Sequence, residues 1–147
     1  MHRSGWLVFI FCAVLGIEIG GWQLALPIGA ALVASLLLHE AGHILVATLL
    51  WVPVREFGLK LGGAYIRRAY ATRRRDEILI SAAGPLTNMA LAIPLNFVPH
   101  FGPQLAMCNI MLGLVNLLPI PSSDGLRILK TLRHPGPPID MASTLKA

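Results

Sequence analysis

The chain has 147 residues, of which 55% are hydrophobic and 13% are charged, and its mean hydropathy is +0.68. This composition is too apolar for an ordinary soluble domain and predicts an integral membrane protein whose surroundings are a lipid bilayer. The formal net charge is +5, but the basic residues lie between apolar stretches rather than along one helix face, which argues against a nucleic-acid partner.

Four apolar stretches predict an all-α membrane protein with about four transmembrane helices, because each crossing needs roughly 20 mostly apolar residues. We expect these spans at about 6–22, 25–51, 78–98 and 104–120. The first stretch could pass for a signal peptide, but Glu18 and the lack of a clear cleavage site favour an uncleaved span. Gly16 and Gly20 in this stretch allow close packing against another helix or against a second copy of the chain, so association into a homo-oligomer stays an alternative.

A polar, arginine-rich segment separates the second and third apolar stretches. Its first part alternates, with Phe57, Leu59 and Leu61 on one side of a strand, and Gly62-Gly63 follows. This pattern predicts a small membrane-associated β-hairpin or sheet after the second span.

The distribution of positive charge predicts the orientation of the chain. Lysine and arginine are absent at 20–23 and 99–103, which connect spans on one side, and are abundant on the other side. We therefore expect both termini in the cytoplasm, in a bacterial-type inner or plasma membrane. One membrane domain is expected to cover 1–133, and the proline-containing residues 134–147 to form a flexible tail.

The second apolar stretch contains His39-Glu40-Ala41-Gly42-His43, an H-E-x-x-H motif. On a helix, histidines four positions apart project from one face, where both imidazoles can reach one Zn²⁺. Glu40 then lies beside the metal and can take a proton from a zinc-bound water molecule, whose pKa the metal lowers to about 7. The alternative is a set of polar residues packed inside a helix bundle. An acid within a span costs roughly 2.5–3.5 kcal/mol, which favours a bound metal as compensation.

Asp124 is the best candidate for the third protein ligand of a tetrahedral zinc site. It follows two prolines that interrupt an apolar helix, and Gly125 permits an unusual turn. Broken helices at membrane depth occur inside protein or around a cavity, where a ligand would be useful. The alternative is that Asp124 caps a cytoplasmic helix beginning at Leu126.

Two motifs resemble those of the site-2 protease family of intramembrane zinc metalloproteases, peptidase family M50. His39–His43 with Ala47 matches the family's H-E-x-G-H signature and the small residue after it, and Asn116–Gly125 matches N-x-x-P-x-P-x-x-D-G. A looser match, Gly84–Asn88, resembles the family's G-x-x-x-N element. The resemblance covers about residues 25–130.

The resemblance implies one zinc ion per chain with three protein ligands: His39, His43 and Asp124. It also implies Glu40 as the general base. Asn88 and Asn116 are candidates to hold the substrate backbone or the developing oxyanion, although asparagines in membrane bundles also bond neighbouring helices without a catalytic role. Ser123 departs from the family, whose members commonly have an apolar residue there.

These features together predict an intramembrane zinc endopeptidase whose substrate is a membrane-anchored protein. Helical substrates hide their amides in hydrogen bonds, so the predicted strand with Phe57, Leu59 and Leu61 offers an edge on which an unwound segment could pair. Two other classes stay open: a catalytically silent binding or regulatory membrane protein of the same fold, and a metal-handling membrane protein.

Overall fold

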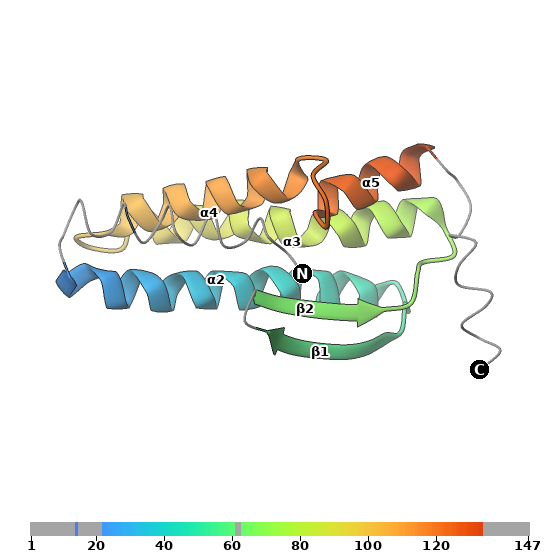
Figure 1. The fold of residues 1–147 in the computed structure, drawn as a ribbon, viewed down its shortest axis with the longest axis horizontal. Helices are drawn as coiled ribbons and strands as arrows, with labels where there is room; N and C mark the ends of the chain where they lie inside the picture. The colour runs from blue at the N-terminus through green and yellow to red at the C-terminus, as the bar shows by residue number, and fades with distance from the viewer. Residues whose placement is uncertain (1–13, 15–21, 61–62, 134–147) are drawn as a thin grey trace.

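The computed structural model describes Val14, residues 22–60 and residues 63–133, with side-chain surroundings at 29–56 and 68–133. Labels are those of Figure 1, where the described elements begin at α2. Their order is α2 (Trp22–Leu49), β1 (Val54–Lys60), β2 (Gly63–Arg68), α3 (Arg74–Leu95), α4 (Gly102–Leu117) and α5 (Asp124–Arg133). The predicted first span, apart from Val14 and Trp22, and the predicted tail at 134–147 lie outside the described residues.

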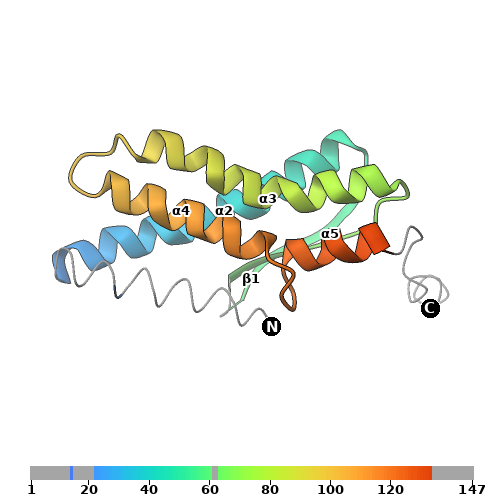
Figure 2. The same cartoon turned by 90° about the horizontal axis from the view of Figure 1, so that it is seen from above.

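The described elements form a layered helical arrangement with a small sheet. α3 and α4 lie together along α2, and α5 continues beyond α4 beside the first half of α3 (Figures 1 and 2). β1 and β2 pair antiparallel, with Phe57 opposite Ile66 and Leu59 opposite Ala64. The sheet lies along α2 on the side away from α4 and α5 (Figure 1).

The helix ends follow from local sequence. α3 begins at Arg74, four residues before the predicted span, because Asp76 and Glu77 place negative charge in the first turn, where the helix dipole favours it. α4 begins with Pro103 in its first turn. It ends at Leu117 because Pro119 disfavours a helical Leu118, whose φ of −67° and ψ of 143° are extended.

Two buried apolar clusters pack the helices together. One joins α2 to α4 and contains Leu32, Leu105, Cys108 and Leu112. The other joins α2 to α3 and the segments flanking the sheet, and contains Ala47, Val52, Ala71 and Ile80. Along α2, His39 and His43 lie between the two clusters, so apolar packing on both sides holds the part of the helix that bears the motif.

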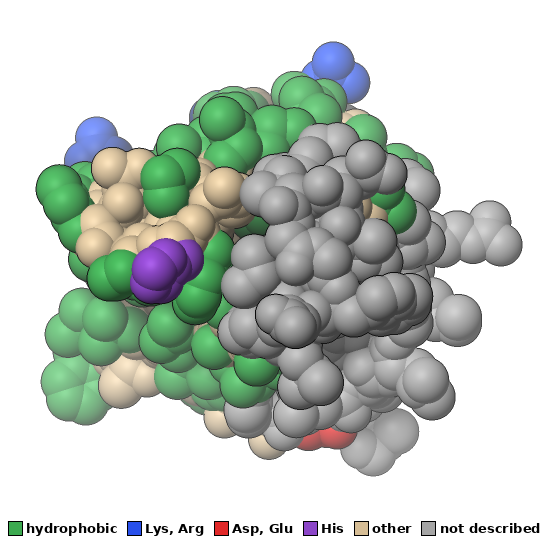
Figure 3. All heavy atoms as spheres, turned by 90° about the vertical axis from the view of Figure 1, so that its left-hand side faces the viewer, with side chains coloured by type: hydrophobic (Ala, Val, Ile, Leu, Met, Phe, Trp, Pro, Cys, Tyr) green, Lys and Arg blue, Asp and Glu red, His purple; other side chains and the backbone are tan. Residues whose placement is uncertain are grey.

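Two of the described helices are long and apolar enough to cross a membrane. They are Gly29–Leu49 and Arg74–Leu95, with hydropathies of 1.7 and 1.6. α4 has 16 residues and is therefore roughly 24 Å long, shorter than a hydrocarbon core of about 30 Å. Large hydrophobic side chains nevertheless point outward from all four described helices, for example Leu45, Ile93, Met107 and Leu132. Hydrophobic side chains also predominate over charged ones on the described part of the face in Figure 3.

Candidate metal centre

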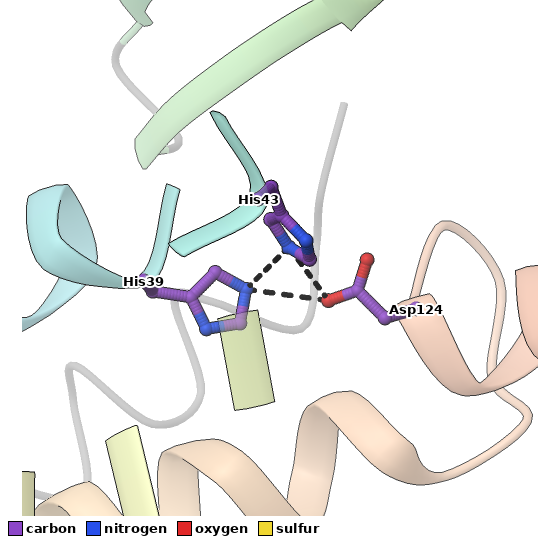
Figure 4. Close-up of side chains that lie close together, drawn as sticks. All are labelled: His39, His43 and Asp124. Carbon is purple, nitrogen blue, oxygen red and sulfur yellow. Dashed lines mark hydrogen bonds and ion pairs between the residues drawn. The ribbon is translucent and has the colours of Figure 1, made fainter. Parts of the chain in front are cut away.

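Three potential metal ligands meet between α2 and the start of α5 (Figure 4). The Nε2 atoms of His39 and His43 are 3.2 Å apart. Oδ2 of Asp124 lies 3.2 Å from Nε2 of His39 and 3.4 Å from Nε2 of His43. The structure thus brings together side chains that are 85 residues apart in the chain.

Hydrogen bonds at the far side of each imidazole orient these atoms. Nδ1 of His39 lies 3.1 Å from Oδ1 of Asn88, and Nδ1 of His43 lies 2.6 Å from the backbone oxygen of Ile80. Both partners are acceptors, so Nδ1 must be the protonated nitrogen that donates. Each Nε2 then carries a lone pair, as a metal-binding histidine requires.

The resulting donor set fits one zinc ion. When both imidazoles are neutral, two Nε2 lone pairs and a carboxylate oxygen face one another, and a cation bound between them removes their mutual repulsion. Bonds of 2.0–2.1 Å at tetrahedral angles place neighbouring ligands about 3.3–3.4 Å apart, which matches the three observed separations. His39 and His43 are buried, at 5% and 7% exposure, and Asp124 is partly buried. Three protein ligands leave the fourth position of a tetrahedron open.

Gly84 on α3 makes room for both imidazoles, a role that sequence reasoning missed. A Cβ atom at this position would overlap Nε2 of His43 and lie 2.6 Å from Nε2 of His39. The backbone of α3 can therefore approach the centre only because residue 84 has no side chain. The available signal was the Gly84-Pro85 pair in an apolar helix, which belongs to the Gly84–Asn88 element that resembles the family's.

Three residues around Asp124 shape the break between α4 and α5. Ser122 adopts a left-handed conformation, with φ of 71°. The Oγ atom of Ser123 accepts a hydrogen bond from the backbone N–H of Leu126 at 3.1 Å, so Ser123 caps α5. A Cβ at Gly125 would overlap the backbone oxygen of Leu117, so glycine permits α5 to start directly against α4. Because Ser123 provides the cap, the Asp124 carboxylate is available to the histidines.

The two asparagines differ in their surroundings. Asn88 is fully buried, and its Nδ2 has no hydrogen-bond partner among the described residues. Asn116 is partly buried, and its Nδ2 donates to the backbone oxygen of Leu112, one turn back in α4. Only Asn88 therefore combines a contact to a ligand histidine with an unpartnered donor.

The other predicted site residues lie around the centre. Glu40 is partly buried, and its carboxylate interacts electrostatically with His39, Asp124 and Arg127. Phe57 and Leu59 lie on β1, where their backbones pair with β2. Leu61, the third residue of the predicted strand face, lies outside the described residues.

Comparisons with known proteins place the chain among zinc metalloproteases of one family. A model described as Peptidase family M50 matches residues 28–104. A putative zinc metalloprotease, Rip3, from Mycobacterium tuberculosis is 33% identical over 123 residues, covering 74% of this chain and 31% of that protein. The zinc metalloprotease MJ0392 from Methanocaldococcus jannaschii is 32% identical over 112 residues, covering 69% and 32%.

A solved structure, the site-2 protease from Methanocaldococcus jannaschii, has a TM-score of 0.65 and 28% identity, covering 90% of this chain and 65% of that one. The chain spans about a third of the length of the curated relatives it matches.

Proposed function

The chain belongs to peptidase family M50, the site-2 protease family, and we propose that it is a zinc endopeptidase that cleaves membrane-embedded segments of protein substrates. The family match confirms the resemblance drawn from the motifs and covers more than half of the chain. The observation that carries the proposed activity is the convergence of two imidazole Nε2 atoms and one carboxylate oxygen at tetrahedral ligand spacing.

The proposed chemistry assigns a separate task to each group. One zinc ion per chain, held by His39, His43 and Asp124, would supply Lewis acidity and an activated water molecule. The Glu40 carboxylate accepts the proton of the attacking water. Glu40 directly follows His39 in the chain, and its carboxylate interacts electrostatically with His39 and Asp124, so it lies beside the metal ligands. Asn88 holds His39 in its metal-binding tautomer through Oδ1.

The unpartnered Nδ2 of Asn88 supports a second task for this residue. A buried donor without a partner is costly, so a substrate oxygen or developing oxyanion that accepts its hydrogen bond would be stabilised. Asn116 is a weaker candidate for the same task, because its amide nitrogen already donates to Leu112. In both assignments, an asparagine amide outside the set of metal ligands would bind the substrate or the oxyanion.

The sheet beside α2 is the proposed holding site for the substrate. A two-stranded sheet has two outer edges, and an extended peptide can add to such an edge through main-chain hydrogen bonds. We propose that an unwound substrate segment pairs along β1, which contains Phe57 and Leu59, and along the predicted continuation at Leu61, which lies outside the described residues. Pairing would expose carbonyl groups that a transmembrane helix otherwise hides.

The proposed location is a bacterial-type plasma membrane with both termini in the cytoplasm. Two apolar helices of spanning length and the outward hydrophobic side chains of the described helices support the membrane setting. The orientation rests on the arginines between the second and third apolar stretches. The substrate is then a membrane-anchored protein, which the bilayer presents to the sheet.

A direct test uses the full chain purified in detergent. We expect about one zinc per chain, and cleavage of a synthetic transmembrane peptide that a chelator abolishes and added Zn²⁺ restores. Stoichiometric zinc without cleavage of any membrane peptide tested would favour the catalytically silent alternative. A chain that binds no zinc would overturn the proposal.

A further inference from the structure

A fully buried carboxylate lies outside the metal centre, in the first turn of α3. Glu77 is 0% exposed, and its two oxygens accept three hydrogen bonds and form one further ion pair. Arg68 donates to both oxygens, at 2.7 and 2.8 Å, and the backbone N–H of Ala71 donates to Oε2 at 3.0 Å. Nε of Arg127 lies 3.3 Å from Oε1. Since a carboxylate offers about four lone-pair sites, Glu77 is satisfied on all sides.

The partners of Glu77 come from different elements. Arg68 is the last residue of β2, and Ala71 lies in the connection to α3. Arg127 lies on α5, three residues after Asp124 and hence about one helical turn from it. One buried carboxylate therefore joins the end of the sheet, the start of α3 and the first turn of the helix that bears the third ligand.

α5 depends on such contacts for its position. It has 10 residues, which is too short for a stable isolated helix, and it follows a turn that contains the left-handed Ser122. Its far end is held by two further hydrogen bonds, from Tyr70 Oη to Thr131 Oγ1 at 2.6 Å and from Arg74 to the backbone oxygen of Leu132 at 2.9 Å. Among the hydrogen bonds and ion pairs of the described residues, the pair between Arg127 and Glu77 joins α3 to the end of α5 that carries Asp124.

The ion pair between Arg127 and Glu77 is half-buried, because the Glu77 side chain is 0% exposed and that of Arg127 is 45% exposed. It differs from apolar packing because its attraction weakens as the guanidinium of Arg127 moves away from the carboxylate of Glu77. Such a contact limits rotation and sliding of α5. A shift of about 1 Å would be enough to break the ligand spacing of 3.2–3.4 Å between Asp124 and the histidines.

We propose that Glu77 is a positioning residue, which holds Asp124 at metal-binding distance from His39 and His43 by orienting α5 through Arg127. The same carboxylate binds Arg68 at the end of β2, so β2 and the helix that bears Asp124 both contact Glu77. This inference rests on the metal centre described under the proposed function.

The decisive variant is Arg127→Met in the full chain. The side chain of Arg127 is 45% exposed, so its replacement leaves the buried pair of Arg68 and Glu77 in place. We expect binding of Zn²⁺ and Co²⁺, measured by chelator competition, to weaken at least about tenfold, as for other groups that orient metal ligands. Removing a cation near a divalent metal would by itself strengthen binding, so weaker binding points to a displaced ligand.

Arg75→Met is the matched control, because it removes the same charge from an exposed position in the first turn of α3. It should bind both metals as the unchanged chain does. The visible absorption of bound Co²⁺, which reports coordination geometry, should change in Arg127→Met and not in Arg75→Met. Equal or tighter binding by Arg127→Met, with an unchanged Co²⁺ spectrum, would overturn the inference.

Glu77→Gln provides a second route to the same conclusion, since it keeps the shape of the side chain and weakens the contacts to both arginines. We expect weaker metal binding and the same change in the Co²⁺ spectrum, with helical circular dichroism retained. If this variant does not fold, Arg127→Met decides the question alone. If the unchanged chain binds metal and both variants bind it equally well, this inference fails and the proposed function stands; an unchanged chain that binds no metal overturns both.

Discussion

Oδ1 of Asn88 on α3 lies 3.1 Å from Nδ1 of His39 on α2. This contact favours the tautomer of His39 in which Nδ1 carries the proton. The unprotonated Nε2 is then the atom that faces Asp124. It also separates two tasks within one side chain, because the oxygen orients a ligand while the amide nitrogen has no partner among the described residues. The two tasks can be tested independently.

Asn88→Asp keeps the acceptor for His39 and removes the unpartnered donor. We expect it to retain zinc by elemental analysis, and to cleave a membrane peptide about 10²–10³-fold more slowly if the donor stabilises the oxyanion. Asn88→Leu removes both groups and should weaken zinc binding about 10–100-fold. Asn116→Leu serves as the control for metal binding, because Asn116 bonds only within its own helix in the described contacts. Unchanged cleavage by Asn88→Asp would remove the oxyanion role.

Glu40→Gln tests the general base. The variant keeps both histidines and Asp124, so zinc content should match that of the unchanged chain. Cleavage of a co-expressed membrane substrate should fall about 10²–10⁴-fold, because the amide cannot accept the proton of the attacking water. Normal cleavage would eliminate Glu40 as the base.

Asp124→Ala tests the third ligand. The change removes the carboxylate 3.2 and 3.4 Å from the two Nε2 atoms and leaves the cap by Ser123 intact. We expect loss of bound zinc from detergent-purified protein, measured by elemental analysis, with helical circular dichroism preserved. Equal zinc content in variant and unchanged chain would reject Asp124 as a ligand.

Gly84→Ala tests the close approach of α3 to the imidazoles. A methyl group there would overlap His43 and crowd His39, so the ligands must move and zinc binding should be lost or strongly weakened. Gly29→Ala makes the same change on α2 where a Cβ meets nothing within 4 Å, and it should retain zinc. Zinc binding that is equal in both variants would show that the crowding is relieved without moving the ligands.

Ser123→Ala tests the cap of α5. Loss of the hydrogen bond to the backbone N–H of Leu126 should lower the free energy of unfolding by about 1 kcal/mol, measured by thermal denaturation in detergent. Ser122→Ala removes a hydroxyl from the neighbouring exposed position and should change stability by less than about 0.5 kcal/mol. A similar loss in both variants would contradict a specific capping role.

Part of the fold could be predicted because apolar stretches and prolines act locally. The second and third apolar stretches correspond to α2 and α3, and the alternating segment between them forms β1 and β2. α3 begins four residues before the predicted apolar span, since the charged residues of its first turn are not part of an apolar stretch. The role of Ser123 was also missed, because a capping serine differs from a loop serine only in what its oxygen contacts.

The sequence by itself determined the family, the membrane-protein composition and the pair of histidines on one helix face, since all three depend on residue type and short-range spacing. Only the tertiary structure decided that Asp124 meets both histidines, that Gly84 must lack a side chain and that Glu77 joins β2 to α5. These relationships join residues from separate elements, and their distances depend on how the helices pack, which no local pattern in the chain records.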